Sequence, residues 1–188
     1  MLVENTLKER SIINTKTLTR TGVLLAIAVS VQSLHLPTYI TGPSINAVLI
    51  VAAIFTGILG GSFIGCITPL MALTMGIVHP VAVPLVPVIM IANCTLVVTF
   101  YLLKNNNHYI ALIAASFAKF FVFYIALNYL IKFIDLNIPA PMLVAFQLPQ
   151  LVTALVGGLA GVAIAKYLER VEYLREQKGY NNQTKQEK

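Results

Sequence analysis

The sequence predicts an all-α integral membrane protein, a bundle of six transmembrane helices with both termini cytoplasmic. The first observation is a stretch without Asp, Glu, Lys or Arg, residues 41–93. A water-soluble protein could not expose so long an uncharged segment, whereas lipid solvates it. The second observation is composition: 57% of the 188 residues are hydrophobic and 11% are charged, and the mean hydropathy is +0.81. These values are typical of a membrane bundle rather than of a domain around one core.

Glycine, proline and short polar segments divide the apolar sequence into six runs of helical length. Pro37 ends the first run, and Gly60-Gly61 is predicted to be a tight turn after the short second run. Pro69 lies inside the third run and is predicted to bend that helix. The predicted spans cover residues 17–36, 45–59, 62–78, 86–103, 109–131 and 146–165.

The connections between these spans differ in character. Residues 37–44 are predicted to form a loop that turns at Thr41-Gly42-Pro43. The segment HPVAVPLVP, residues 79–87, carries three prolines and is apolar, so we expect irregular backbone that folds back over the bundle like a lid. Residues 104–107 form a short polar hairpin connection, and a longer polar segment with Asp135 separates the last two spans.

The basic residues predict the orientation. Only Lys132 flanks the side opposite the termini, so the positive-inside rule places both termini in the cytoplasm. Tyr101, Tyr109 and Tyr167 mark the same membrane interface. The basic residues on the terminal side are Lys8, Arg10, Lys16, Arg20, Lys104, Lys166, Arg170, Arg175, Lys178, Lys185 and Lys188.

This pattern predicts one membrane domain, residues 17–168, between two cytoplasmic tails, residues 1–16 and 169–188. The first tail is too polar for a signal peptide. The second alternates in charge and is predicted to be a short helical extension that frays after Gly179. The predicted location is a bacterial-type plasma membrane. Because the basic residues gather in tails and one loop, the pI near 9.4 does not indicate a nucleic-acid partner.

Cys66 and Cys94 both lie inside apolar runs, where they are predicted to be small buried side chains rather than a disulfide. On the first span, Gly22, Ala26 and Ser30 recur every four residues and place small side chains on one stripe. Such a stripe lets another helix approach closely. It serves either packing inside the bundle or docking of a partner subunit.

Polar side chains inside the spans are expensive in hydrocarbon unless they face each other, water or a ligand. Seven of them fall in the predicted outer half of the membrane: Gln32, His35, Asn46, His79, Asn93, Gln147 and Gln150. Taken singly, each amide is expected to join helices, and His79 caps a loop equally well. Together they come from five spans and predict an outward-facing pocket for a small polar molecule.

Lys119 is the one charged residue in the middle of a predicted span. A charge at this depth costs at least ~2.5 kcal/mol on insertion scales. A bound ligand, a cage of backbone carbonyls and a neutral amine all remain open explanations. The predicted substrate-binding residues are Gln32, Asn46, His79, Asn93, Lys119, Gln147 and Gln150.

Several function classes are excluded by what the sequence lacks. It contains no Walker loop, no HExxH or CxxC motif, and no Ser and His with a carboxylate partner. We therefore expect no catalytic residues, metal site or cofactor. Asp135 is the only acidic residue near a span, so the usual ion site of a proton- or sodium-coupled carrier is also missing. Energy must come from a partner, or transport is passive.

These residues resemble a known family, the substrate-binding S components of energy-coupling factor (ECF) vitamin transporters. The resemblance covers residues 17–168 and begins with the stripe Gly22, Ala26 and Ser30. It continues through Gly42-Pro43-x-x-Asn46, Gly60-Gly61, Thr68-Pro69, Gly76, His79-Pro80, Pro84, Pro87, Asn93, Lys119 and Gln147-Leu148-Pro149-Gln150.

The resemblance implies a subunit of an ABC importer that captures a vitamin or vitamin precursor. It implies that the first-helix stripe docks on a transmembrane coupling subunit bound to two cytoplasmic ATPases, and that a loop after the first helix gates the site. Ala28 offers a second docking register beside Gly22, Ala26 and Ser30.

The lysine amid amides favours a carboxylate-bearing substrate such as nicotinate or pantothenate, while a neutral pyrimidine or purine base remains open through amide pairs. A passive carrier or channel and a structural membrane subunit are the alternative functions.

Overall fold

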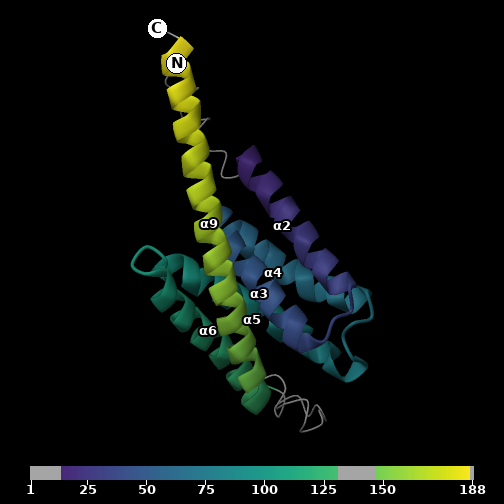
Figure 1. Ribbon diagram of the computed structural model, residues 1–188. Coiled ribbons are helices and arrows are strands. Elements are labelled where there is room, and N and C mark those ends of the chain that lie inside the picture. The colour runs from purple at the N-terminus through teal and green to yellow at the C-terminus, as the bar shows by residue number, and fades with distance from the viewer. Residues whose placement is uncertain (1–13, 131–146, 187–188) are drawn as a thin grey trace, which may run out of the picture.

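The computed structural model describes residues 14–130 and 147–186, which form helices without any strand. Figure 1 shows that α2 begins and α9 ends toward the same end of the bundle, here called the terminal end. Within these ranges the α-helices are α2 (Thr15–Ser33), α3 (Thr38–Phe55), α4 (Gly57–Thr74), α5 (Val86–Leu103), α6 (His108–Ile125) and α9 (Leu148–Gln186), with a 3₁₀-helix, η1 (Pro80–Leu85), and a π-helix, η2 (Ala126–Leu130).

Five of these helical segments are long and apolar enough to cross a membrane: Thr38–Phe55, Gly57–Thr74, Ala82–Leu103, His108–Asn128 and Leu148–Arg175. They confirm an all-helical, multi-pass membrane protein. The first predicted span is also a helix, α2, but it is not among the five. Lys16 and Arg20 in its first two turns and Gln32 near its end make it more polar than the others.

Two predicted connections are wrong. Residues 38–44 are helical, and Pro43 lies inside α3 rather than in a loop. The tight turn falls at Thr56-Gly57 instead of Gly60-Gly61, and Gly57 takes a positive φ of 72° that favours glycine. Gly61 is instead a packing position, because a Cβ there would lie 2.7 Å from Cγ1 of Val97.

The prediction for residues 79–87 holds only in part. The backbone is not irregular, because residues 80–85 form a 3₁₀-helix and Val86 and Pro87 begin α5. Ala82 and Leu85 are buried, as expected of a segment that folds back over the bundle. α5 covers the predicted 86–103, and Pro69 lies inside α4. Cys66 and Cys94 carry free thiols as predicted, with their Sγ atoms 3.3 Å apart, but both are only partly buried.

The predicted fraying after Gly179 is wrong, because α9 continues to Gln186. Glu, Leu, Arg, Gln and Lys, which all favour helix, dominate residues 168–178 and carry the helix out of the bundle. The predicted connection with Lys132 and Asp135, and residues 1–13 of the first tail, lie outside the described residues.

α3 lies at the centre and contacts α2, α4, α5 and α9. Its residues from Ile45 to Ala53 are all buried. Glycines on α9 let the two backbones meet: Gly157 faces the carbonyl of Pro43, and a Cβ at Gly161 would lie 2.7 Å from the carbonyl oxygen of Ala47. α9 packs closely on α3, and α5 packs closely on α6. These contacts set the positions of α3, α5 and α6, which carry the buried polar residues of the candidate site.

Candidate functional site

Three polar residues from three helices meet in the middle of the bundle. The Lys119 ammonium on α6 donates hydrogen bonds to Oδ1 of Asn46 on α3, at 2.7 Å, and to Oδ1 of Asn93 on α5, at 2.8 Å. Their residues are 3%, 2% and 3% exposed. We call these three residues the lysine cluster. They are three of the seven residues that the sequence predicts for a binding pocket, and no two of them share a helix.

α4 supports the lysine cluster through the backbone carbonyl that Pro69 leaves without its helical donor. Pro69 has no amide N–H, so the carbonyl of Gly65, four residues earlier, lacks its helical donor. Nδ2 of Asn93 donates to that carbonyl at 3.0 Å. A Cβ at Gly65 would lie 3.1 Å from Cβ of Asn93, so glycine permits the approach. The proline and glycine therefore orient the Asn93 amide with its oxygen toward Lys119.

The electrostatics of the lysine cluster are unusual because only neutral groups face the ammonium. No Asp or Glu occurs between residues 10 and 134, and the ion pairs in the described part of the chain are both made by Glu172. A lysine ammonium carries three protons. Two are bound by the asparagine oxygens, and the described residues offer the third no acceptor. A ligand with an acceptor oxygen can take that third proton.

Two more buried polar groups have unused hydrogen-bonding capacity within the described residues. Gln32 on α2 donates from Nε2 to the carbonyl of Thr68 at 3.0 Å, while its Oε1 is unpaired. Ser116 is fully buried, and its hydroxyl is also unpaired. Ser116 lies one turn before Lys119 on the same face of α6. Sequence reasoning missed Ser116, although its three-residue spacing from Lys119 was the signal.

The remaining predicted pocket residues lie at the end of the bundle opposite the terminal end. Gln147 and Gln150 flank the start of α9, where the Gln147 carbonyl accepts from the backbone amide of Gln150 at 3.1 Å. His79 is exposed and directly precedes η1. None of the three has a described hydrogen bond to the lysine cluster. No group of three His, Cys, Asp or Glu residues suited to a metal ion occurs within the described ranges.

The small-residue stripe of α2 points away from the bundle. Gly22, Ala26 and Ser30 are exposed, and a Cβ at Gly22 would meet nothing within 4 Å. Ala28, the alternative register, is fully buried in the core. The exposed register is therefore the one open to another helix.

The fold and the lysine cluster together define a multi-pass helical membrane protein with a polar centre. Residues 16–169 match the sequence profile of the ECF transporter family, substrate-specific component. Because the match covers most of the chain, the protein belongs to this family, whose members are transport subunits rather than enzymes. Neither the curated proteins nor the solved structures yield a match to the chain.

Proposed function

We propose that this protein captures a small vitamin-like metabolite at a pocket facing outward from the cell and delivers it to an ECF complex. The energy is supplied by ATP hydrolysis on two ATPase subunits, which reach the protein through a transmembrane coupling subunit. The observation that carries this proposal is the lysine cluster, a buried cation held only by neutral amides in a chain of the substrate-specific family.

A buried ammonium without a counterion costs free energy in a membrane. The asparagine oxygens reduce that free-energy cost, but they leave one ammonium proton without an acceptor. An anionic oxygen of a substrate supplies both the missing acceptor and the missing charge. The favoured substrate is therefore a small carboxylate such as nicotinate or pantothenate, and a neutral pyrimidine or purine base is the second candidate.

The substrate enters from the end opposite the termini. Gln32, His79, Gln147 and Gln150 lie toward that end and supply donors and acceptors above the lysine cluster. The unpaired Oε1 of Gln32 and the unpaired hydroxyl of Ser116 add two groups with free capacity. Because the three cluster residues are nearly fully buried, binding must first open the contacts around them.

Thermal stabilisation of the purified chain by a panel of vitamins and nucleobases tests the proposal. A ligand that binds the folded state raises the melting temperature by mass action. We expect a carboxylate-bearing compound to give the largest rise. Lys119→Met should weaken its affinity at least about tenfold, because the anion loses its charged partner. Lys166→Met, the same change at the terminal end, should leave the affinity unchanged.

No rise across the panel would favour the passive carrier or the structural subunit instead. Passive transport predicts flux into liposomes without ATP or partner subunits. A purely structural role predicts that Lys119→Met changes the melting temperature but no binding curve.

The docking part of the proposal rests on the exposed stripe of α2. Ala26→Trp should abolish ATP-dependent uptake in the complete transporter while substrate binding to the isolated chain persists, because the indole blocks close helix approach. Ala160→Trp, at an exposed alanine of α9, is the matched control and should retain uptake. Full uptake by Ala26→Trp would remove this stripe as the docking surface.

A further inference from the structure

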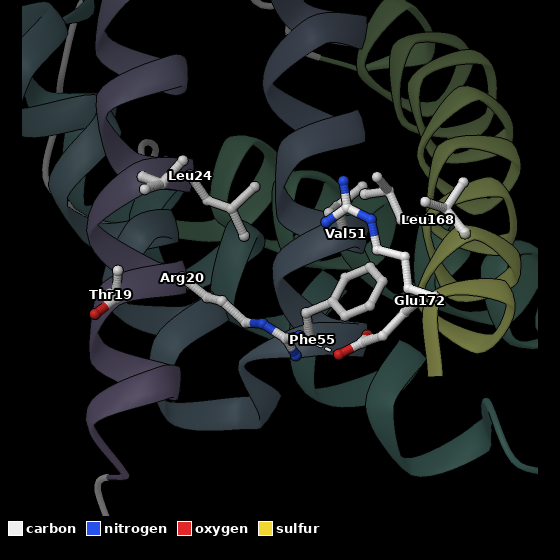
Figure 2. Close-up of a pocket in the computed structure, with 10 residues that line it drawn as sticks. Thr19, Arg20, Leu24, Val51, Phe55, Leu168 and Glu172 are labelled. Atoms are coloured by element: carbon white, nitrogen blue, oxygen red, sulfur yellow. Dashed lines mark hydrogen bonds and ion pairs between the residues drawn. The ribbon is translucent and has the colours of Figure 1, made fainter. Parts of the chain in front are cut away.

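A second polar region lies at the terminal end, where α2, α3 and α9 line an open pocket of about 410 Å³. Of these helices only α3 also carries a residue of the lysine cluster, and its Val51 and Phe55 lie after Asn46, toward the terminal end. This volume is within the range of roughly 300–1,000 Å³ that is typical of small-ligand sites. We call it the terminal pocket. Figure 2 shows Arg20 of α2 reaching toward Glu172 of α9 beside the ring of Phe55.

The wall of the terminal pocket changes from apolar to charged along the bundle. Among its lining residues, Leu24, Val51 and Leu168 come from positions farther along their helices from the terminal end, and Arg20, Glu172 and Arg175 come from positions nearer that end. Figure 2 shows the labelled aliphatic residues on one side of the Arg20 to Glu172 contact. Leu168 and Arg175 are seven residues apart on α9, roughly 10 Å along the axis.

The pocket lies at the level where a membrane interface is expected. Tyr167 directly precedes Leu168 and is 67% exposed. Nearby connections place the ammonium of Lys104 4.3 Å from the ring centroid of Tyr101, and that of Lys166 4.5 Å from the ring centroid of Tyr109. Tyrosine and lysine together are typical of the headgroup region of a membrane. The apolar part of the pocket then faces acyl chains, and the charged part faces headgroups.

The charged part of the pocket has an excess of cations. Lys16 and Arg20 both contact Oε1 of Glu172, at 3.0 and 2.9 Å. Arg20 also lies 5.3 Å from the ring centroid of Phe55, which holds its guanidinium at the pocket. The described residues place no carboxylate within ion-pair distance of Arg175. Arg20, at the pocket, and Lys16, beside it, therefore share one carboxylate, and Arg175 pairs with none among the described residues.

We propose that the terminal pocket binds an anionic phospholipid from the leaflet on the terminal side. The phosphate lies among Arg20, Arg175 and Lys16, and an acyl chain lies along Leu24, Val51 and Leu168. Basic pockets between membrane helices are suited to such headgroups, because the guanidinium fork binds phosphate oxygens and the surrounding lipid supplies the ligand. A small soluble anion would leave the apolar half of the pocket without a partner.

Native mass spectrometry of the full chain in detergent, titrated with dioleoyl phosphatidylglycerol or dioleoyl phosphatidylcholine, tests this inference. We expect phosphatidylglycerol to bind about tenfold more tightly or better, because the two lipids differ in net headgroup charge. Glycerol phosphate, which carries the phosphate without acyl chains, should not displace the lipid at equal concentration.

Substitutions inside and outside the terminal pocket test where phosphatidylglycerol binds. Arg20→Gln combined with Arg175→Gln should lower phosphatidylglycerol affinity about tenfold or more. Lys166→Gln removes a cation at the same end but outside the pocket, and it should have no effect. Leu168→Trp fills the apolar part without changing charge, and it should lower affinity as well. Thermal unfolding of each variant separates loss of binding from loss of fold.

Three outcomes would overturn the inference. Equal affinity for the two lipids would do so, and so would an equal loss in Lys166→Gln, which would indicate a diffuse surface charge. The third is unchanged lipid affinity in the double arginine variant together with lost assembly with the ECF partner subunits. That result would assign the pocket to a segment of the coupling subunit instead.

Discussion

The lysine cluster and the terminal pocket both hold a cation between helices, yet they use opposite partners. Lys119 is 3% exposed and faces two neutral amide oxygens, whereas the side chain of Arg20 is 33% exposed and faces the Glu172 carboxylate at 2.9 Å. Near water an ion pair is easily formed and contributes little to stability. In the membrane interior, a carboxylate would neutralise the lysine and leave no charge for a ligand. The lack of a carboxylate beside Lys119 supports the proposed binding role of this lysine.

The largest effect should come from removing both neutral acceptors of Lys119. Asn46→Leu combined with Asn93→Leu leaves a buried ammonium without a partner, so we expect a loss of about 3 kcal/mol or more in the free energy of unfolding. Thermal unfolding in detergent measures it. Adding Lys119→Met to this variant should recover much of the loss, because an apolar cluster contains no unsatisfied charge. A triple variant as unstable as the double would show that shape, not charge, dominates here.

An intermediate effect is expected at the support of the lysine cluster. Gly65→Ala places a methyl group 3.1 Å from Cβ of Asn93 and moves the amide that orients toward Lys119. We expect a loss of about 1 to 2 kcal/mol in stability and weaker substrate binding. Gly22→Ala is the matched control, because a Cβ there meets nothing within 4 Å. If Gly65→Ala changed neither stability nor substrate binding, α4 and α5 would be free to move apart at this level.

The smallest effect on stability is expected at the terminal pocket. Glu172→Gln removes the carboxylate of two surface ion pairs, and we expect the melting temperature to stay within the scatter of replicates. Phosphatidylglycerol should bind this variant more tightly, because Lys16 and Arg20 lose a competing anion. Glu169→Gln, the same change outside the pocket, should leave lipid affinity unchanged. A large fall in melting temperature for Glu172→Gln would erase the contrast between the two regions.

Much of the bundle could be predicted from the sequence because hydropathy and proline act locally. The limits of α5 follow from the residues alone. The Gly60-Gly61 turn could not be predicted correctly, since glycine serves equally for a turn and for close helix packing. Only the position of Val97 on another helix decides between them. Pro43 is ambiguous in the same way. A proline usually indicates a loop or the end of a helix, but here it lies inside α3.

The candidate site divides in the same way. Lys119, Asn46 and Asn93 stand out in the sequence because polar groups are rare in uncharged spans. The packing of α3, α5 and α6 decides which of the predicted residues meet. It brings Lys119, Asn46 and Asn93 into hydrogen-bonding contact, and no described hydrogen bond joins His79, Gln147 or Gln150 to them. Ser116 and the terminal pocket could not be predicted from the sequence for a related reason. A serine or a surface arginine is ordinary in sequence, and only its neighbours make it informative.

The sequence by itself determined that this chain is a helical membrane protein with polar residues concentrated in a few spans. The reason is that the polarity of each side chain sets its preference for lipid or water. The tertiary structure alone decided which polar groups became partners. Hydrogen bonds and ion pairs act over a few ångströms, and residues 46, 93 and 119 come that close only after three helices have packed. Packing also selected the outward register of the α2 stripe by burying Ala28.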